Sequence, residues 1–391
     1  MRSSPARRLL LMSVSVLGLL AAVAGTNRVG DPYGIWRTQL IDDVYRRCHD
    51  DRLSRAYRLL RERPRAILLG NSRVAWGMPI QGSASDGVFN AAFPSLRLDE
   101  LEAVAGAAIR QPRVTRLVWA IDFTLFDSEA VAAPPERIDA LRARLQGNGL
   151  QLVTEALLSL DALDESRRVI FRALGAPLGL TDPATPRAIA WSPAVLRAAL
   201  ARASGAGMSG FDRQTIRSEI VKGFALYQRY RFADRSLERV RDAVRAARAG
   251  GIDVSLVALP QSEYELEIIR QAGLWDLYLR WERRLLEIGP YWDFSGYTDP
   301  ARMDDLFMDP VHFRPPMGHV ILRHLLGEDC SECGDTAQVI LATGVWVDDT
   351  SIDRHLAEQD ARRMARTRES SAYAEAVADA LATGVQRLAR R

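Results

Sequence analysis

The chain has 391 residues, of which 48% are hydrophobic and 26% are charged. This is the balance of a globular protein with a real core, and it excludes intrinsic disorder for most of the length. The 52 basic and 49 acidic residues nearly cancel, so the charge indicates no nucleic-acid partner, and three cysteines are too few for a disulfide scaffold.

The N-terminal segment resembles a membrane-targeting sequence. Three arginines in the first eight residues precede residues 9–25, which carry no charge. We expect residues 1–30 to form a signal anchor or signal peptide that leaves the rest of the chain on the far side of the inner membrane. A small-residue cleavage site at Ala22-Val23-Ala24 leaves open a cleaved signal peptide and a secreted protein.

The next part of the chain predicts a linker and then an α/β domain. Residues 31–63 include an amphipathic helix over residues 37–63. Short apolar runs at residues 65–70, 88–90 and 117–121 are typical of buried strands, and residues 97–110 have helical spacing. This alternation predicts a mainly parallel sheet within an α/β domain over residues 64–327.

Beyond the third strand the pattern becomes helical and then returns to α/β. Residues 127–235 predict a helical insertion. A helix over residues 235–249 ends at Gly250-Gly251 and leads to a strand at residues 254–259. One long amphipathic helix is expected over residues 262–288, with a last strand at residues 292–294. Residues 328–391 are expected to form a helical C-terminal extension.

Two short segments carry reactive side chains. Gly70-Asn71-Ser72-Arg73 follows the first strand, and ligands of open α/β sheets bind beyond the carboxyl ends of the strands. Ser72 there can act as a nucleophile beside backbone N–H groups that stabilise an oxyanion. The alternative is that Ser72 only caps the following helix.

The second segment is Asp309-Pro310-Val311-His312. Histidine is the usual base that removes a serine proton at neutral pH, and a carboxylate three residues earlier can orient its imidazole across a turn that Pro310 favours. The alternative is a loop histidine beside a capping aspartate. The two segments together, at the start and end of one α/β unit, favour a Ser72-His312-Asp309 triad.

These two segments resemble those of the SGNH (GDSL-like) hydrolase superfamily, over roughly residues 60–125 and 235–325. Among its members, the chain resembles membrane-anchored bacterial proteins such as those of alginate O-acetylation and of D-alanine transfer to teichoic acid. The resemblance implies a three-layer α/β/α sandwich, ester or acyl substrates, and the roles of nucleophile, base and orienting acid for Ser72, His312 and Asp309. No histidine–carboxylate cluster in the sequence has the spacing of a zinc site, and we expect no metal and no cofactor.

The chain departs from the superfamily's pattern at the residues that would bind the oxyanion. The glycine of the second block and the Gly-x-Asn of the third are absent; the matching strand ends contain Asn90 and Asp122. We expect Asn90 to supply an amide N–H to the oxyanion, with Asn71 also at the substrate. Because an ionised Asp122 cannot donate, we expect it to pair with Arg73 and hold the nucleophile turn; a capping role for Asp122 is equally open.

The remaining candidates are structural. Cys330 and Cys333 are expected to form a local disulfide in an oxidising compartment, which leaves Cys48 as a buried or free thiol. The tryptophans at positions 275, 281 and 292 are expected to be core residues and not sugar platforms.

The sequence therefore predicts an extracytoplasmic serine esterase or O-acyltransferase that acts on acyl esters of an envelope or secreted glycan. The expected partners are that acylated substrate, the inner membrane and an envelope-assembly protein. Two alternatives remain: a non-catalytic glycan-binding or scaffolding component of a polysaccharide assembly complex, and an esterase of lipids. An enzyme loses turnover in Ser72→Ala, whereas a scaffold keeps its binding.

Overall fold

The structure is a computed structural model that describes residues 5–36, 40–41, 51–78, 87–147, 149–175, 192–203, 213–369 and 372–388. Its contacts divide the chain into two compact units. Unit 1 joins Met1–Glu62 to Asp139–Ile189, and unit 2 joins Arg63–Ile138 to Ala190–Arg391. The helical insertion predicted over residues 127–235 is thus shared between the two units.

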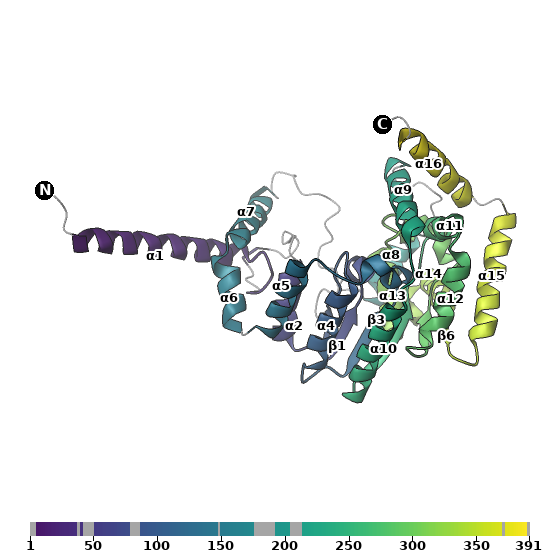
Figure 1. Cartoon of the computed structure of the whole chain (residues 1–391), viewed down its shortest axis with the longest axis horizontal. Helices are drawn as coiled ribbons and strands as arrows, with labels where there is room; N and C mark the ends of the chain where they lie inside the picture. The colour runs from purple at the N-terminus through teal and green to yellow at the C-terminus, as the bar shows by residue number, and fades with distance from the viewer. Residues whose placement is uncertain are drawn as a thin grey trace. The chain divides into compact units, whose positions relative to one another are not determined.

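Unit 1 is helical. It contains α1 (Pro5–Gly30), α2 (Asp51–Glu62), α6 (Gly149–Leu158), α7 (Leu160–Gly175) and the second half of α5 (Pro135–Gln146). Residues 42–50 of the predicted linker helix, Cys48 among them, lie outside the described residues. Tyr33, Ile35, Ala156 and Ala162 form a small core, and α6 and α7 lie beside the C-terminal end of α1 (Figure 1).

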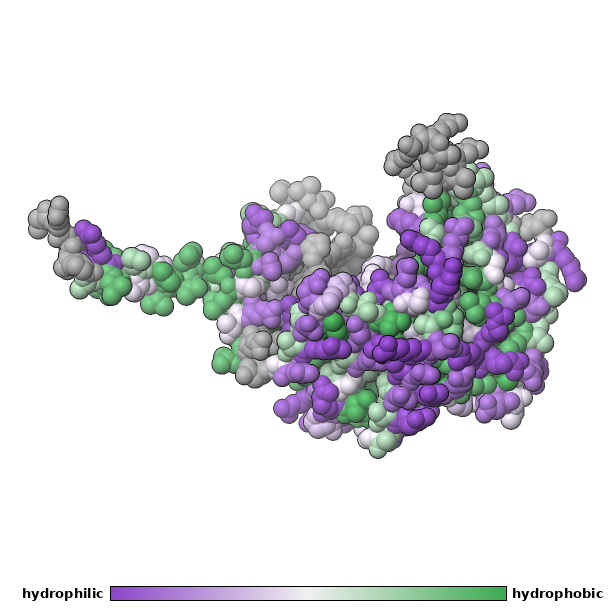
Figure 2. Space-filling view, viewed as in Figure 1, coloured by the Kyte–Doolittle hydropathy of each residue, from purple (hydrophilic) through white to green (hydrophobic). Residues whose placement is uncertain are grey.

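Helix α1 is apolar along most of its length. Its segment Ala6–Gly30 is long and apolar enough to cross a membrane, judged by length and composition. Its large side chains, such as Leu9 and Leu17, are about two-thirds exposed and form a continuous apolar surface (Figure 2). The predicted N-terminal apolar helix is therefore present.

Unit 2 is a mixed α/β structure built on a six-stranded, mostly parallel sheet in the order β2-β1-β3-β4-β5-β6. The strands are β1 (Ala66–Leu69), β2 (Val88–Asn90), β3 (Arg116–Ala120), β4 (Asp253–Ala258), β5 (Tyr291–Asp293) and β6 (Val345–Val347). The first five are parallel and lie where the apolar runs predicted them, because a strand covered on both faces needs continuous apolar sequence. Antiparallel β6 pairs with β5 and was not predicted, so the C-terminal extension is not wholly helical.

The helices of unit 2 connect and cover the strands. They are α3 (Ser72–Gly77), α4 (Leu98–Ile109), α8 (Pro193–Ala203), α9 (Arg213–Arg229), α10 (Asp234–Ala249), α11 (Glu263–Gln271), α12 (Trp275–Leu285), α13 (Pro315–Leu326), α14 (Asp335–Ala342), α15 (Ile352–Arg368) and α16 (Ala372–Leu388). The single helix predicted over residues 262–288 is wrong. It is two helices, because Gly273 takes the left-handed conformation (φ +75°) that ends α11.

Other predictions about structural residues are confirmed. Cys330 and Cys333 form a disulfide, and both are buried. Trp275 and Trp281 are buried core residues, and Trp292 packs against the core. Because the five parallel strands end at one edge of the sheet, the residues that come after β1, β3 and β4 converge at that edge.

Candidate active site

Ser72, His312 and Asp309 form a hydrogen-bonded chain. Ser72 Oγ lies 2.8 Å from His312 Nε2, and His312 Nδ1 lies 2.8 Å from Asp309 Oδ2. These residues come from the turn after β1 and from the loop before α13, 240 positions apart in sequence. The side chains of His312 and Asp309 are 16% and 25% exposed, and Ser72 is half-buried. The arrangement is that of a nucleophile, a base and an orienting acid.

Asn71, and not Ser72, caps helix α3. The Asn71 Oδ1 atom accepts a hydrogen bond from the backbone N–H of Arg73 at 3.0 Å. This satisfies one of the N–H groups that a helix start leaves unpaired, so the Ser72 hydroxyl is not needed for capping. Within the described residues, the N–H of Ser72 has no hydrogen-bond partner. It is available to a ligand beside the hydroxyl.

A tight loop fixes the imidazole. Phe307 and Phe313 form an isolated antiparallel bridge, which brings the two ends of the loop together. Asp309 Oδ1 accepts hydrogen bonds from the backbone N–H groups of Val311 and His312, at 2.8 and 2.9 Å. Burial alone would raise the pKa of Asp309, but its bonds to His312 and to the backbone hold that pKa below its usual value. Asp309 is thus kept ionised and holds Nδ1 protonated, which leaves Nε2 to accept the serine proton.

Helix α3 packs tightly against this loop. A Cβ atom on Gly77 would lie 2.2 Å from the ring of Phe313, so only glycine allows the contact. Phe313 is fully buried among Val74, Met78 and Met317. Close packing of α3 on the loop that carries His312 therefore holds Ser72 close to His312.

Asn90 is not placed as an oxyanion donor. Its Nδ2 group donates to the carbonyl oxygens of Val74 and Met78, both at 2.8 Å, which engages both protons. Its Oδ1 accepts from the N–H of Ala92 at 3.0 Å. Asn90 therefore ties the end of β2 to the C-terminal turn of α3. The expectation that its side chain binds the substrate is wrong, because the carbonyls that end a short helix compete for the same amide.

Arg73, next to Ser72 in the chain, is buried among acidic partners. Its Nη1 lies 3.8 Å from Asp122 Oδ1, as expected from the sequence, but its Nη2 makes a closer bond to Glu265. Tyr227 donates to the other carboxylate oxygen of Glu265 at 2.7 Å. Burial would lower the pKa of Arg73, but Glu265 and Asp122 raise it, so the guanidinium stays charged. This network holds the residue next to Ser72.

Sequence reasoning missed Glu265 and Trp76. Glu265 stands in a Ser262-x-x-Glu265 pattern at the start of α11, a capping-box signature that marks a helix N-terminus at the carboxyl edge of the sheet. Trp76 lies one turn after Ser72 on α3. Its ring centre is 4.5 Å from that of His312, and it is 44% exposed. The i, i+4 spacing from Ser72 is the signal that could have found it.

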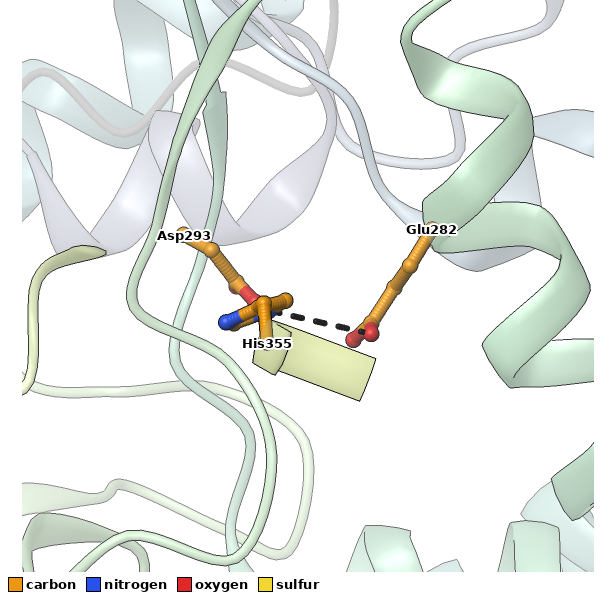
Figure 3. Close-up of side chains that lie close together, drawn as sticks. All are labelled: Glu282, Asp293 and His355. Carbon is orange, nitrogen blue, oxygen red and sulfur yellow. Dashed lines mark hydrogen bonds and ion pairs between the residues drawn. The ribbon is translucent and has the colours of Figure 1, made fainter. Parts of the chain in front are cut away.

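Among the described residues, one group has the ligand types for a metal: Glu282, Asp293 and His355, all buried (Figure 3). His355 Nε2 is 2.7 Å from Asp293 Oδ2 and 3.8 Å from Glu282 Oε2. Two ligands of one zinc ion, each about 2 Å from it, would be roughly 3.3 Å apart in a tetrahedron. The shorter distance is that of a hydrogen bond. Burial, followed by the nearby Asp293, raises the pKa of Glu282 well above its usual value, so the cluster fits a hydrogen-bonded tie between α15 and β5.

Comparison of the chain with models of protein families, with curated proteins and with solved structures finds no match. A function for the chain must therefore be inferred from the geometry around Ser72.

Proposed function

We propose that the protein is a serine ester hydrolase or O-acyltransferase of the SGNH type, with Ser72 as nucleophile, His312 as base and Asp309 as orienting acid. The observation that carries this proposal is the unbroken hydrogen-bonded chain from Ser72 Oγ through both ring nitrogens of His312 to Asp309, with Ser72 only half-buried. A serine that served only structure would have no need of a base oriented by an ionised carboxylate.

The first half-reaction transfers the acyl group to the enzyme. Ser72 Oγ attacks the acyl carbonyl while its proton passes to His312 Nε2. The N–H of Ser72 and the Nδ2 group of Asn71 are the donors available for the oxyanion, since the amide of Asn90 is engaged elsewhere. The C–O bond to the leaving alcohol then breaks, and His312 returns the proton to that oxygen. The product is an acyl ester of Ser72.

The second half-reaction repeats these steps with another acceptor. A water molecule or a sugar hydroxyl gives its proton to His312 and attacks the acyl-Ser72 carbonyl, which frees the serine. Water gives hydrolysis, and a sugar hydroxyl gives transfer. The exposed indole of Trp76 beside His312 supports a substrate with a flat apolar face, such as a pyranose ring.

The proposed compartment is the extracytoplasmic side of the inner membrane, with α1 as an uncleaved anchor. Helix α1 runs unbroken through the cleavage site considered at Ala22–Ala24. Asn27 and Gly30, in its last turn, are buried within unit 1. The Cys330–Cys333 disulfide also supports an oxidising, exported location.

The arrangement of helices supports the proposed three-layer sandwich. Helices α4 and α10 contact each other and strands β1 and β4, whereas α13 packs with α3, α8 and α14. This grouping is what two helical layers around a parallel sheet require.

One observation favours the scaffold alternative. Both protons of the Asn90 side-chain amide are donated to backbone carbonyl oxygens. The site therefore has fewer donors for an oxyanion than the superfamily's pattern supplies. Hydrolysis of 4-nitrophenyl acetate by the full chain tests the two functions. The proposed enzyme turns over this ester and loses that turnover in Ser72→Ala, whereas a scaffold gives the same background rate with either serine or alanine.

A further inference from the structure

Helix α7 has one buried face and, on the opposite side, three exposed apolar side chains beside the ion pair of Arg167 and Asp164. Its inner face, with Ala162, Glu165, Ser166 and Val169, is buried in unit 1. Leu160, Phe171 and Leu174 are 75%, 66% and 67% exposed. At 3.6 residues per turn these three lie within one face, on the side of the helix opposite Val169.

Helix α6 repeats this pattern. Leu150 and Leu158 are 74% and 41% exposed and lie on one face, whereas Ala156 is buried on the other side of the helix. The two helices meet at Ser159, so Leu158 and Leu160 flank the junction. We call these five side chains, Leu150, Leu158, Leu160, Phe171 and Leu174, the outer apolar face.

The junction of α6 and α7 is attached to the end of α1. The Asn27 side chain donates to the carbonyl oxygens of Leu157 and Ser159, at 2.8 and 3.3 Å. Gly30 approaches α7 so closely that a Cβ atom would lie 2.6 Å from Cβ of Ser166. The outer apolar face is therefore held at the level of the last turn of α1.

That level is where a membrane-spanning α1 would leave the bilayer. About 20 helical residues cross the hydrocarbon core, so a span that begins at Leu9 ends near Arg28. Arg28 places its guanidinium 5.2 Å from the ring centre of Trp36. An arginine and a tryptophan are typical of the boundary between acyl chains and headgroups.

From this placement we infer that the outer apolar face lies in the lipid interface beside α1. Unit 1 then rests on the membrane surface at the point where α1 leaves the bilayer. The outer apolar face contacts the boundary between acyl chains and headgroups of the bilayer that α1 crosses. The junction of α6 and α7 is bonded to Asn27, so the face begins at the level of the last turn of α1. On the same side of α7, Arg167 and Asp164 form an exposed ion pair at 2.8 Å, which places that part of the face among the headgroups and not among the acyl chains.

The inference rests on the proposed role of α1 as an anchor, so the experiment measures the membrane depth of α1 as well as that of the outer apolar face. The full chain, with Cys48→Ser, is reconstituted in vesicles of phosphatidylethanolamine and phosphatidylglycerol, and single cysteines carry a spin label. Test positions are Phe171→Cys and Leu174→Cys. Leu17→Cys in α1 is the lipid reference, and Leu226→Cys, an exposed leucine of unit 2, is the matched control. Relaxation by oxygen and by a water-soluble nickel chelate reports the depth of each label.

We expect the labels at 171 and 174 to resemble the label at 17, with an oxygen-to-nickel accessibility ratio several-fold above that at 226. If the label at 17 is in lipid and the labels at 171 and 174 have the ratio found at 226, the outer apolar face does not lie in the lipid interface, although α1 is still an anchor. Low accessibility to both reagents at 171 and 174 would mean that protein covers the face, and this also overturns the inference. A water-exposed label at 17 overturns the anchor itself.

Discussion

Gly318 of α13 lies so close to Gly77 of α3 that a Cβ atom on Gly318 would be 1.9 Å from the Gly77 carbonyl oxygen. Helix α13, which follows the loop of His312, thus rests directly on the backbone of α3, which begins with Ser72. Ser72 and His312 are brought together by this backbone contact as well as by their own hydrogen bond.

Gly318→Ala should therefore damage both stability and activity. The added methyl group must push α3 and α13 apart, and overpacking of this kind costs about 1–3 kcal/mol. A shift of about 1 Å between Ser72 and His312 can lower kcat/KM about 100-fold. Chemical denaturation and ester hydrolysis measure the two effects. Gly106→Ala is the control, because its Cβ would meet nothing nearer than Arg110 Nη1 at 3.5 Å. We expect that variant to be as stable as the parent or slightly more stable.

Asp309→Asn should leave the fold intact and lower kcat by roughly 10⁴-fold, because an amide no longer enforces the Nδ1–H tautomer of His312. Steady-state kinetics near neutral pH are the measurement, and equal rates for the variant and the parent would remove Asp309 from the site.

Asp309 also links the stability of the fold to pH. Since the folded-state pKa of Asp309 is below its unfolded value, its contribution to the free energy of unfolding is present above that unfolded pKa. The contribution disappears as the pH falls through the folded pKa.

Glu265→Gln should lower the free energy of unfolding more than Asp122→Asn does. Glu265 bonds directly to Arg73, whereas Asp122 is 3.8 Å away. Loss of one partner from a buried pair costs about 3–5 kcal/mol, and we expect about 1 kcal/mol for Asp122→Asn. Urea unfolding of both variants gives the comparison. A larger loss in Asp122→Asn would show that Asp122, as the sequence suggested, is the principal partner of the nucleophile turn.

Asp304 should make the fold less stable as the pH rises. Burial, with Asp305 and Glu263 nearby, raises its pKa from 3.8 to about 6, despite the hydrogen bond from Tyr373 of α16. The folded state therefore binds more protons than the unfolded state between these values. The free energy of unfolding contributed by Asp304 falls from about pH 4 to about pH 6 and is constant above. Unfolding of the parent and Asp304→Asn across this range measures the difference. A constant difference between the two would contradict the raised pKa.

The sequence predicted the parallel sheet because each strand is an apolar run covered on both faces, as in Ile67-Leu68-Leu69. Strand β6 was missed because it is three residues long, lies at the sheet edge and exposes Trp346, so it has no such run. The split between α11 and α12 depends on one backbone angle at Gly273, which helical periodicity does not reveal.

At the site, the contact of Asp309 with His312 and the pairing of His312 with Ser72 were predictable from the two reactive segments, but the partners of Arg73 and Asn90 were predicted only in part. The Asp309–His312 contact lies within one turn, so spacing was enough to propose it. The bond from Arg73 to Glu265 joins residues 192 positions apart, and nothing local identifies Glu265 as its partner. The sequence did not reveal that the Asn90 amide donates to the carbonyl oxygens of Val74 and Met78. The positions of these two acceptors depend on how α3 packs, so Asn90 was wrongly assigned to the oxyanion.

Labelling by a fluorophosphonate probe, read by intact mass, tests the Ser72-His312-Asp309 site most directly. The full chain is used, because Asn27 and Gly30 in the last turn of α1 are buried in unit 1 and truncation would remove them. We predict that the parent gains one probe mass, which neither Ser72→Ala nor His312→Ala gains. A well-folded parent that stays unlabelled, or one that is labelled equally in Ser72→Ala, would contradict an activated serine at this position.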